Sequence, residues 1–138
     1  SSTMKAIRLF APLLTTLLIA SCGFENFDER CEREAQEYTQ KQCPRRMDQY
    51  TMMDSLTYNK PTRTLTYYYT LEGMLDNDSV MTPDAGNILE ANLKEAIINS
   101  VDLKTHKDKG INFCYCYHSK ATGKVRFTTT ITQADYSK

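Results

Sequence analysis

In the stretch RTLTYYYTLEG, residues 63–73, the side chains alternate in character along the chain. One set is apolar or aromatic: Leu65, Tyr67, Tyr69 and Leu71. The other set mostly carries hydroxyls: Thr64, Thr66, Tyr68 and Thr70. A period of two residues is typical of a β-strand with one buried face. The preceding YTMMDSLTY, residues 50–58, has a similar composition, and NKPTR between them contains turn residues, so the two segments predict a β-hairpin.

A second hairpin follows near the end of the chain. INFCYCYH, residues 111–118, and KVRFTTTITQ, residues 124–133, are joined by the turn-forming SKATG. One face is apolar and contains Ile111, Phe113, Tyr115, Tyr117, Val125, Phe127, Thr129 and Ile131. The opposite face contains Asn112, Cys114, Cys116, His118, Arg126, Thr128 and Thr130. Both hairpins therefore need cover on one side only.

Two helices are predicted to supply this cover. The first is ERCEREAQEYTQKQ, residues 29–42, with Asp28 as its cap and an end before Cys43, because the residue ahead of a proline disfavours the helix. Its apolar stripe is narrow, which places it on the surface of the core. The second starts at Thr82-Pro83 and extends to about Ser100, with a stronger apolar face.

The order α-β-β-α-β-β predicts the α+β class. The expected architecture has two layers: an antiparallel four-stranded sheet with the helices packed on one face. The other face of the sheet is then open to solvent.

The N-terminal segment is too short and too interrupted to span a membrane. Its apolar run, residues 7–20, falls below the roughly 20 residues that a transmembrane helix needs. Lys5 and Arg8 form a positive region ahead of the apolar residues 13–20, as in an export signal. Residues 19–22, IASC, resemble the lipobox of bacterial lipoproteins. The resemblance implies cleavage before Cys22 and acylation of the Cys22 sulfur and of the new amino terminus.

This resemblance defines the expected organisation and location. Residues 1–21 are a cleaved signal peptide, residues 22–28 a lipidated tether and residues 29–138 a single α+β domain. The lipobox implies a lipid-anchored protein of a bacterial cell envelope, and Gly23, where an aspartate would favour the inner membrane, favours the outer one. The segment MDSLTYNKPTRTLTYYYTLEG is also similar to a segment of small envelope lipoproteins, a likeness that implies no activity.

Charge argues against nucleic acid as a partner. The chain has 17 basic and 17 acidic residues. Removal of Lys5 and Arg8 leaves 17 − 2 = 15 basic residues and a net charge of 15 − 17 = −2. A slightly acidic domain lacks the basic surface that nucleic-acid binding requires.

Four cysteines remain once Cys22 carries lipid: Cys31, Cys43, Cys114 and Cys116. An even number in an exported domain predicts disulfides. Cys31 and Cys43 stand at opposite ends of one helix, and Cys114 and Cys116 are two residues apart on a strand, so each is expected to pair across to the other set. If the helices cover the Phe113 face, however, the strand cysteines point away from them. Either the first helix then wraps onto the other face, or these bridges do not form.

A metal site is the alternative use of the same strand. Cys114, Cys116 and His118 project from one face, and thiolate and imidazole ligands suit zinc or copper. His106, in the preceding connection, is a possible fourth ligand. The C-x-C-x-H pattern lacks the second ligand pair that makes structural zinc motifs specific.

The sequence contains no motif for catalysis. A G-x-S-x-G elbow, an H-E-x-x-H pair, a glycine-rich phosphate loop and a C-x-x-C pair are all missing.

We therefore expect a non-enzymatic module, without a cofactor other than the lipid, that binds another envelope protein or an envelope polymer as an adapter. The alternative is a metal- or thiol-dependent factor built on Cys114, Cys116 and His118. The candidate binding surface is the open sheet face, with Thr66, Tyr68, Thr128 and Thr130.

Overall fold

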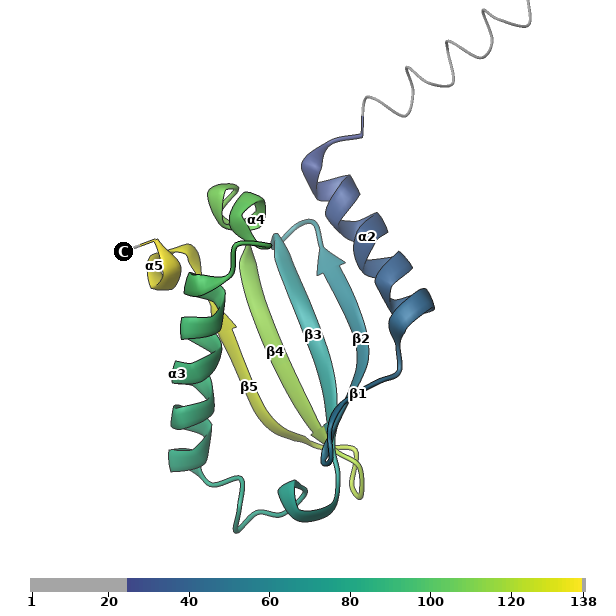
Figure 1. Cartoon of the computed structure of the whole chain (residues 1–138), viewed down its shortest axis with the longest axis vertical. Coiled ribbons are helices and arrows are strands. Elements are labelled where there is room, and N and C mark those ends of the chain that lie inside the picture. Colours follow the sequence, from purple (N-terminus) through teal and green to yellow (C-terminus); the bar gives the residue numbers. More distant parts are fainter. Residues whose placement is uncertain (1–24, 138) are drawn as a thin grey trace, which may run out of the picture.

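The computed structural model describes residues 25–137, which form one five-stranded sheet flanked by helices (Figure 1). The elements in chain order are α2 (Phe27–Gln42), β1 (Arg45–Asp48), β2 (Thr51–Asn59), β3 (Thr64–Leu71), the 3-10 turn η1 (Gly73–Leu75), α3 (Pro83–Asn99), α4 (Lys104–Asp108), β4 (Asn112–Ser119), β5 (Val125–Ile131) and α5 (Gln133–Tyr136). None of the helices in this part of the chain combines the length and the apolar character needed to cross a membrane. The α+β class is confirmed.

The sheet is mixed, whereas the sequence predicted an antiparallel sheet of four strands. Its order is β1-β2-β3-β4-β5, and both predicted hairpins, β2-β3 and β4-β5, are present. The two hairpins meet through β3 and β4, which are parallel. The connection between these strands contains α3, which returns the chain to the end of the sheet where β3 began, as a parallel crossover requires.

The fifth strand, β1, was not predicted. It is short and exposed along its whole length, and it pairs only with the first residues of β2. Its sequence, RRMD, has no apolar alternation that would mark it as a strand.

We call the two sides of the sheet the inner face and the outer face. The inner face carries the core residues Met53, Tyr58, Leu65, Tyr69, Leu71, Phe113, Tyr115, Tyr117 and Ile131. The outer face carries Thr66, Tyr68, Cys114, Cys116, His118, Thr128 and Thr130. Both long helices lie on the inner side, as predicted, but at its two margins: α2 runs along β2, and α3 lies beside β5 (Figure 1).

The first helix, α2, is fixed to the margin of the sheet by polar contacts as well as by its narrow apolar stripe. Two residues of this stripe, Cys31 and Ala35, are buried. The Thr39 hydroxyl donates to the Leu56 carbonyl oxygen at 2.8 Å and accepts from the Leu56 N–H at 2.9 Å. Since β1 pairs with β2 only up to Met53, Thr39 satisfies the backbone of β2 where no strand covers its edge.

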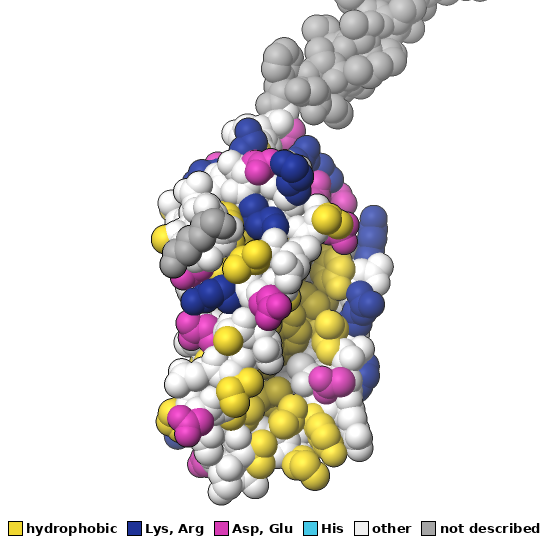
Figure 2. Space-filling model, turned by 60° about the vertical axis from the view of Figure 1, so that its left-hand side comes forward, with side chains coloured by type: hydrophobic (Ala, Val, Ile, Leu, Met, Phe, Trp, Pro, Cys, Tyr) yellow, Lys and Arg dark blue, Asp and Glu magenta, His cyan; other side chains and the backbone are white. Residues whose placement is uncertain are grey.

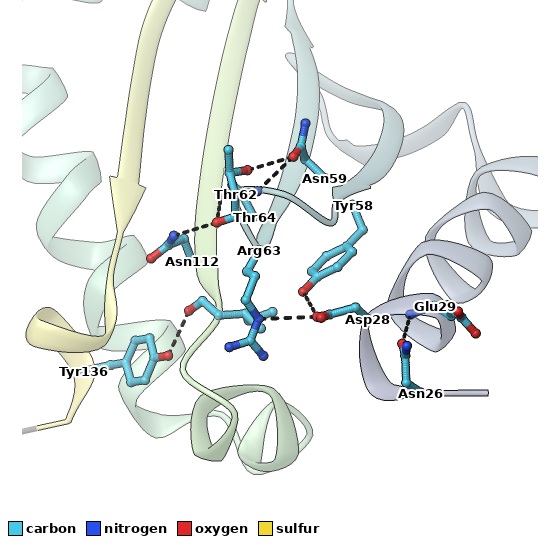
Figure 3. Close-up of polar contacts among 11 residues, drawn as sticks. Asn26, Asp28, Glu29, Tyr58, Asn59, Thr62, Arg63, Thr64, Asn112 and Tyr136 are labelled. Carbon is cyan, nitrogen blue, oxygen red and sulfur yellow. Dashed lines mark hydrogen bonds and ion pairs between the residues drawn. The ribbon is translucent and has the colours of Figure 1, made fainter. Parts of the chain in front are cut away.

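The start of α2 is fixed by a different residue from the one predicted. Asn26, not Asp28, caps the helix by accepting from the Glu29 N–H at 2.8 Å. Asp28 instead accepts from the Tyr58 hydroxyl at 2.6 Å and pairs with Arg63 (Figure 3). These contacts bind the first turn of α2 to the turn between β2 and β3.

The second helix, α3, begins as predicted, with Thr82 accepting from the Ala85 N–H and Pro83 in the first turn. Gly86 brings the helix close to β5, because a Cβ atom at this position would lie 3.0 Å from the Phe127 ring. At the other end of β5, the Tyr136 hydroxyl of α5 donates to the Ile111 carbonyl oxygen at 2.8 Å (Figure 3).

The loop after β3 is held against the turn between β4 and β5. Arg126 forms ion pairs with Asp76 and Asp78 of this loop, and Asp76 also accepts from the Ala121 N–H. The Ser119 hydroxyl, this N–H and the Arg126 guanidinium lower the pKa of the Asp76 carboxyl to about 2. The carboxylate form is therefore favoured by the folded protein.

Candidate binding groove

The middle of the inner face, between α2 and α3, is floored by stacked tyrosines. Tyr67 stacks on Tyr115 with 4.7 Å between ring centroids, and Tyr69 stacks on Tyr117 at the same separation. Tyr69 and Tyr115 join the two pairs at 6.4 Å. We call these four residues the tyrosine ladder. It arises because the register places two tyrosines of β3 directly opposite two of β4.

The hydroxyls of the tyrosine ladder have no partner among residues 25–137, although Tyr69, Tyr115 and Tyr117 are only 7–8% exposed. Within residues 25–137, none of the four hydroxyls makes a hydrogen bond. A fully buried polar atom without a partner occurs in this part of the chain only at His106 Nδ1, so none of the ladder hydroxyls is fully buried and each reaches solvent. Burial of the rings raises the pKa of all four, that of Tyr69 to about 12. The hydroxyls therefore stay protonated at neutral pH and can donate hydrogen bonds.

A cavity of about 380 Å³ opens beside the ladder, between α3, β1 and the sheet. It is lined mainly by apolar side chains, among them Met47, Leu71, Leu75, Met81, Ile88 and Leu89. Figure 2 shows this side of the molecule, with hydrophobic side chains in a hollow. Two side chains on its rim are unusually exposed: Ile88 at 64% and Met47 at 47%. We call the cavity and the tyrosine ladder together the groove.

The residues predicted as a binding surface lie together on the outer face. Thr66 and Thr130 flank Cys114, and Tyr68 and Thr128 flank Cys116 in the neighbouring row. The sequence therefore predicted their juxtaposition. They lie on the side of the sheet opposite to the groove.

The structure does not support the predicted disulfides. Cys31, Cys43, Cys114 and Cys116 are all free thiols. Cys114 and Cys116 alternate with buried aromatic residues of β4 and so face outward, whereas α2 packs on the inner side. The first helix thus does not wrap onto the outer face, and the other alternative, that these bridges do not form, holds.

The alternative metal site is only partly assembled. Cys116 Sγ lies 3.8 Å from His118 Nε2, and Cys114 Sγ lies 3.8 Å from the Thr128 hydroxyl. His106 lies in α4, with its ring edge against Phe27. Across residues 25–137, no three potential ligands come together as a metal ion would require. The predicted lipidation site, Cys22, and its signal peptide lie outside the described residues.

The sequence did not predict the groove, because two helices were expected to cover the inner face. One signal was available. Tyr67, Tyr69, Tyr115 and Tyr117 occupy inner positions where a dry core would favour aliphatic residues, and a phenol hydroxyl needs water or a partner. The rings are buried, with Tyr69, Tyr115 and Tyr117 only 7–8% exposed, but within residues 25–137 their hydroxyls find no hydrogen-bond partner.

The fold and the groove define a small α+β domain with a half-open sheet, and sequence comparison places it in a family. A model described as "Domain of unknown function (DUF8479)" matches residues 26–127, and the chain belongs to this family. No protein of curated function matches the sequence.

Two solved structures are similar in fold. A Pseudomonas aeruginosa protein described as secreted has a TM-score of 0.65 and 13% identity over 78% of this chain and 90% of the other. A pilotin from the type 2 secretion system of Vibrio vulnificus, EpsS, has a TM-score of 0.57 and 9% identity over 78% of this chain and 89% of the other. At such low identities the likeness shows the fold alone.

Proposed function

We propose that this protein is a non-enzymatic, lipid-anchored adapter of the bacterial cell envelope that binds a segment of another envelope protein in the groove. The observation that carries the proposal is the tyrosine ladder, whose hydroxyls reach solvent unpaired beside an apolar cavity. Tyrosine is enriched at protein interfaces because it combines apolar area with a polar tip. A groove with a few polar groups on an apolar floor is the usual form of a recognition site.

The proposed anchor suits this arrangement. Acylation of Cys22 would place the lipid a few residues before Phe27, the first residue of α2. This end of α2 lies at the same end of the molecule as α4, and the cavity lies toward the other end of α3, where its lining residues Ala85 and Ile88 are located (Figure 1). A partner could therefore reach the groove while the opposite end faces the bilayer. The pilotin among the similar structures belongs to a secretion system, which is compatible with an envelope protein as the partner.

Site-specific photo-crosslinking in the native bacterium tests the binding site. We would place benzoylphenylalanine at Ile88, on the rim of the groove, at Ile98, which is exposed on the same helix but does not line the cavity, and at Tyr68 on the outer face. A discrete envelope protein should be crosslinked from Ile88 only. Crosslinking from Tyr68 in place of Ile88 would show that the partner binds the outer face.

The anchor is tested separately by Cys22→Ser. We expect the wild-type chain to incorporate a labelled fatty acid and to be cleaved before residue 22, and this variant to do neither, because the lipobox cysteine is needed for both steps. A Cys22→Ser chain that incorporates the fatty acid as the wild type does would contradict lipid attachment at this position.

A further inference from the structure

The arginines of the domain differ in one respect that bears on the groove. Arg30, Arg33, Arg46, Arg63 and Arg126 each pair with at least one carboxylate. Arg45 has no carboxylate within 4.0 Å among residues 25–137, and its side chain makes a single hydrogen bond, to the Tyr38 hydroxyl at 3.1 Å. A guanidinium without an anionic partner is free to bind one, in the fork geometry that suits carboxylates.

Arg45 lies on the inner face, in the same row as the tyrosine ladder. The strand register sets Arg45 opposite Met53, Met53 opposite Tyr69, and Tyr69 opposite Tyr117. Side chains in one row across a sheet project to the same side. Arg46, the next residue, projects to the outer face and is bound to Glu72. Arg45 therefore adds a positive charge to the groove, and Figure 2 shows basic side chains along one side of the hollow.

The hydroxyls near Arg45 can assist it. Tyr38, which accepts from Arg45, packs together with Tyr67 against the core that contains Tyr69. The hydroxyls of Tyr67 and Tyr69 remain protonated and have no protein partner. Arg45 and these two hydroxyl donors thus lie on the same face of the sheet, next to an apolar cavity that Tyr69 lines and Arg45 does not.

We propose that the groove selects a carboxylate-bearing apolar peptide segment, with Arg45 and the hydroxyls of Tyr67 and Tyr69 binding the carboxylate and the cavity holding the apolar side chains. This inference rests on the proposed function, whose site it makes chemically specific. Charge is what identifies the occupant: five arginines are paired with carboxylates within residues 25–137, whereas Arg45 is not and lies on the face of the sheet that carries the groove. The one carboxylate that lines the cavity, Asp48, accepts a hydrogen bond from the Tyr50 N–H.

Selection from a displayed library of random 16-residue peptides tests this chemistry. The full chain is used in three forms: wild type, Arg45→Glu and Arg46→Glu. We expect wild type and Arg46→Glu to enrich peptides with Asp or Glu beside Leu, Ile, Met or Phe. Arg45→Glu should instead enrich Lys or Arg beside the same apolar residues. Arg46→Glu is the matched control, because it changes the same charge one residue away on the opposite face.

A peptide from the wild-type selection is then synthesised with its acidic residue intact or replaced by the neutral amide. Fluorescence anisotropy should show about tenfold to a hundredfold weaker binding for the amide peptide, since a hydrogen bond to a charged group contributes about that much. Arg45→Gln should weaken the acidic peptide equally and leave the amide peptide unchanged. Equal loss for both peptides would overturn the role of Arg45.

The outcomes separate this inference from the proposed function. If peptides are enriched by wild type and lost with Ile88→Asp, but carry no acidic preference, the groove binds peptides and the carboxylate inference is wrong. If no enriched peptide depends on Ile88, the proposed function itself fails. Acidic peptides enriched equally by Arg45→Glu would also overturn the inference, because they must bind elsewhere.

Discussion

Removal of the Thr39 hydroxyl tests how α2, one wall of the groove, is held in place. Valine has the same shape as threonine and a similar helix propensity, so Thr39→Val deletes the hydroxyl with little other change. The hydroxyl makes two hydrogen bonds to the backbone of Leu56, at 2.8 and 2.9 Å, where the edge of β2 has no strand beside it.

The expected loss of stability follows from these two bonds. An intramolecular hydrogen bond contributes about 1 kcal/mol net, and a donor left buried without a partner costs about 1–3 kcal/mol. Leu56 is half-buried, so water can replace part of what the hydroxyl supplied. We therefore expect Thr39→Val to lower the free energy of unfolding by about 2 kcal/mol.

Equilibrium urea unfolding followed by far-UV circular dichroism gives this free energy. Thr39→Ser is the control, since it keeps the hydroxyl and loses only a methyl group, and it should lie much closer to wild type than Thr39→Val. A Thr39→Val chain within about 0.5 kcal/mol of wild type, which is the range of neutral surface substitutions, would refute the claim that this hydroxyl anchors α2.

Three further predictions concern charge, thiols and packing. The pKa of Asp76 is about 2 in the folded protein and about 3.9 in an unfolded chain, so the contribution of Asp76 to stability is complete above pH 5 and declines as the pH falls toward 2. Asp76→Asn should therefore lower the urea midpoint at pH 6 and make the midpoint fall less steeply below pH 4. A pH profile identical to that of the wild type would contradict this. Burial raises the pKa of the Cys31 thiol to about 11, so maleimide should leave Cys31 unmodified in the native protein and modify Cys114. Mass spectrometry should detect no disulfide between these two residues, and such a bridge would contradict the structure. Gly86→Val should lower the melting temperature, since a β-branched side chain would meet the Phe127 ring, whereas an unchanged melting temperature would show that α3 is not held this close.

The sequence predicted the elements whose patterns are local. Alternation in residues 63–73 located β3 and its apolar face, and Thr82-Pro83 located the start of α3. The capping box of α5, between Thr132 and Asp135, was equally local and was overlooked.

The remaining features depend on where distant segments meet. The parallel pairing of β3 with β4 depends on the path of the connection through α3, which no period in the sequence encodes. The same holds for the groove, because its width is set by how far apart α2 and α3 lie at the margins of the sheet. The proposed role of Arg45 in binding a carboxylate likewise depends on its register with Met53, in a strand whose sequence shows no apolar alternation.

Binding of the partner in the groove can be measured by co-purification from the native envelope. Lipid-anchored chains with Ile88→Asp on the groove rim or Tyr68→Asp on the outer face are solubilised in mild detergent. Proteins retained by each are then quantified by mass spectrometry against wild type. We expect one envelope protein that is retained by wild type and Tyr68→Asp and lost with Ile88→Asp. A partner that is lost with Tyr68→Asp and retained by Ile88→Asp would contradict binding in the groove.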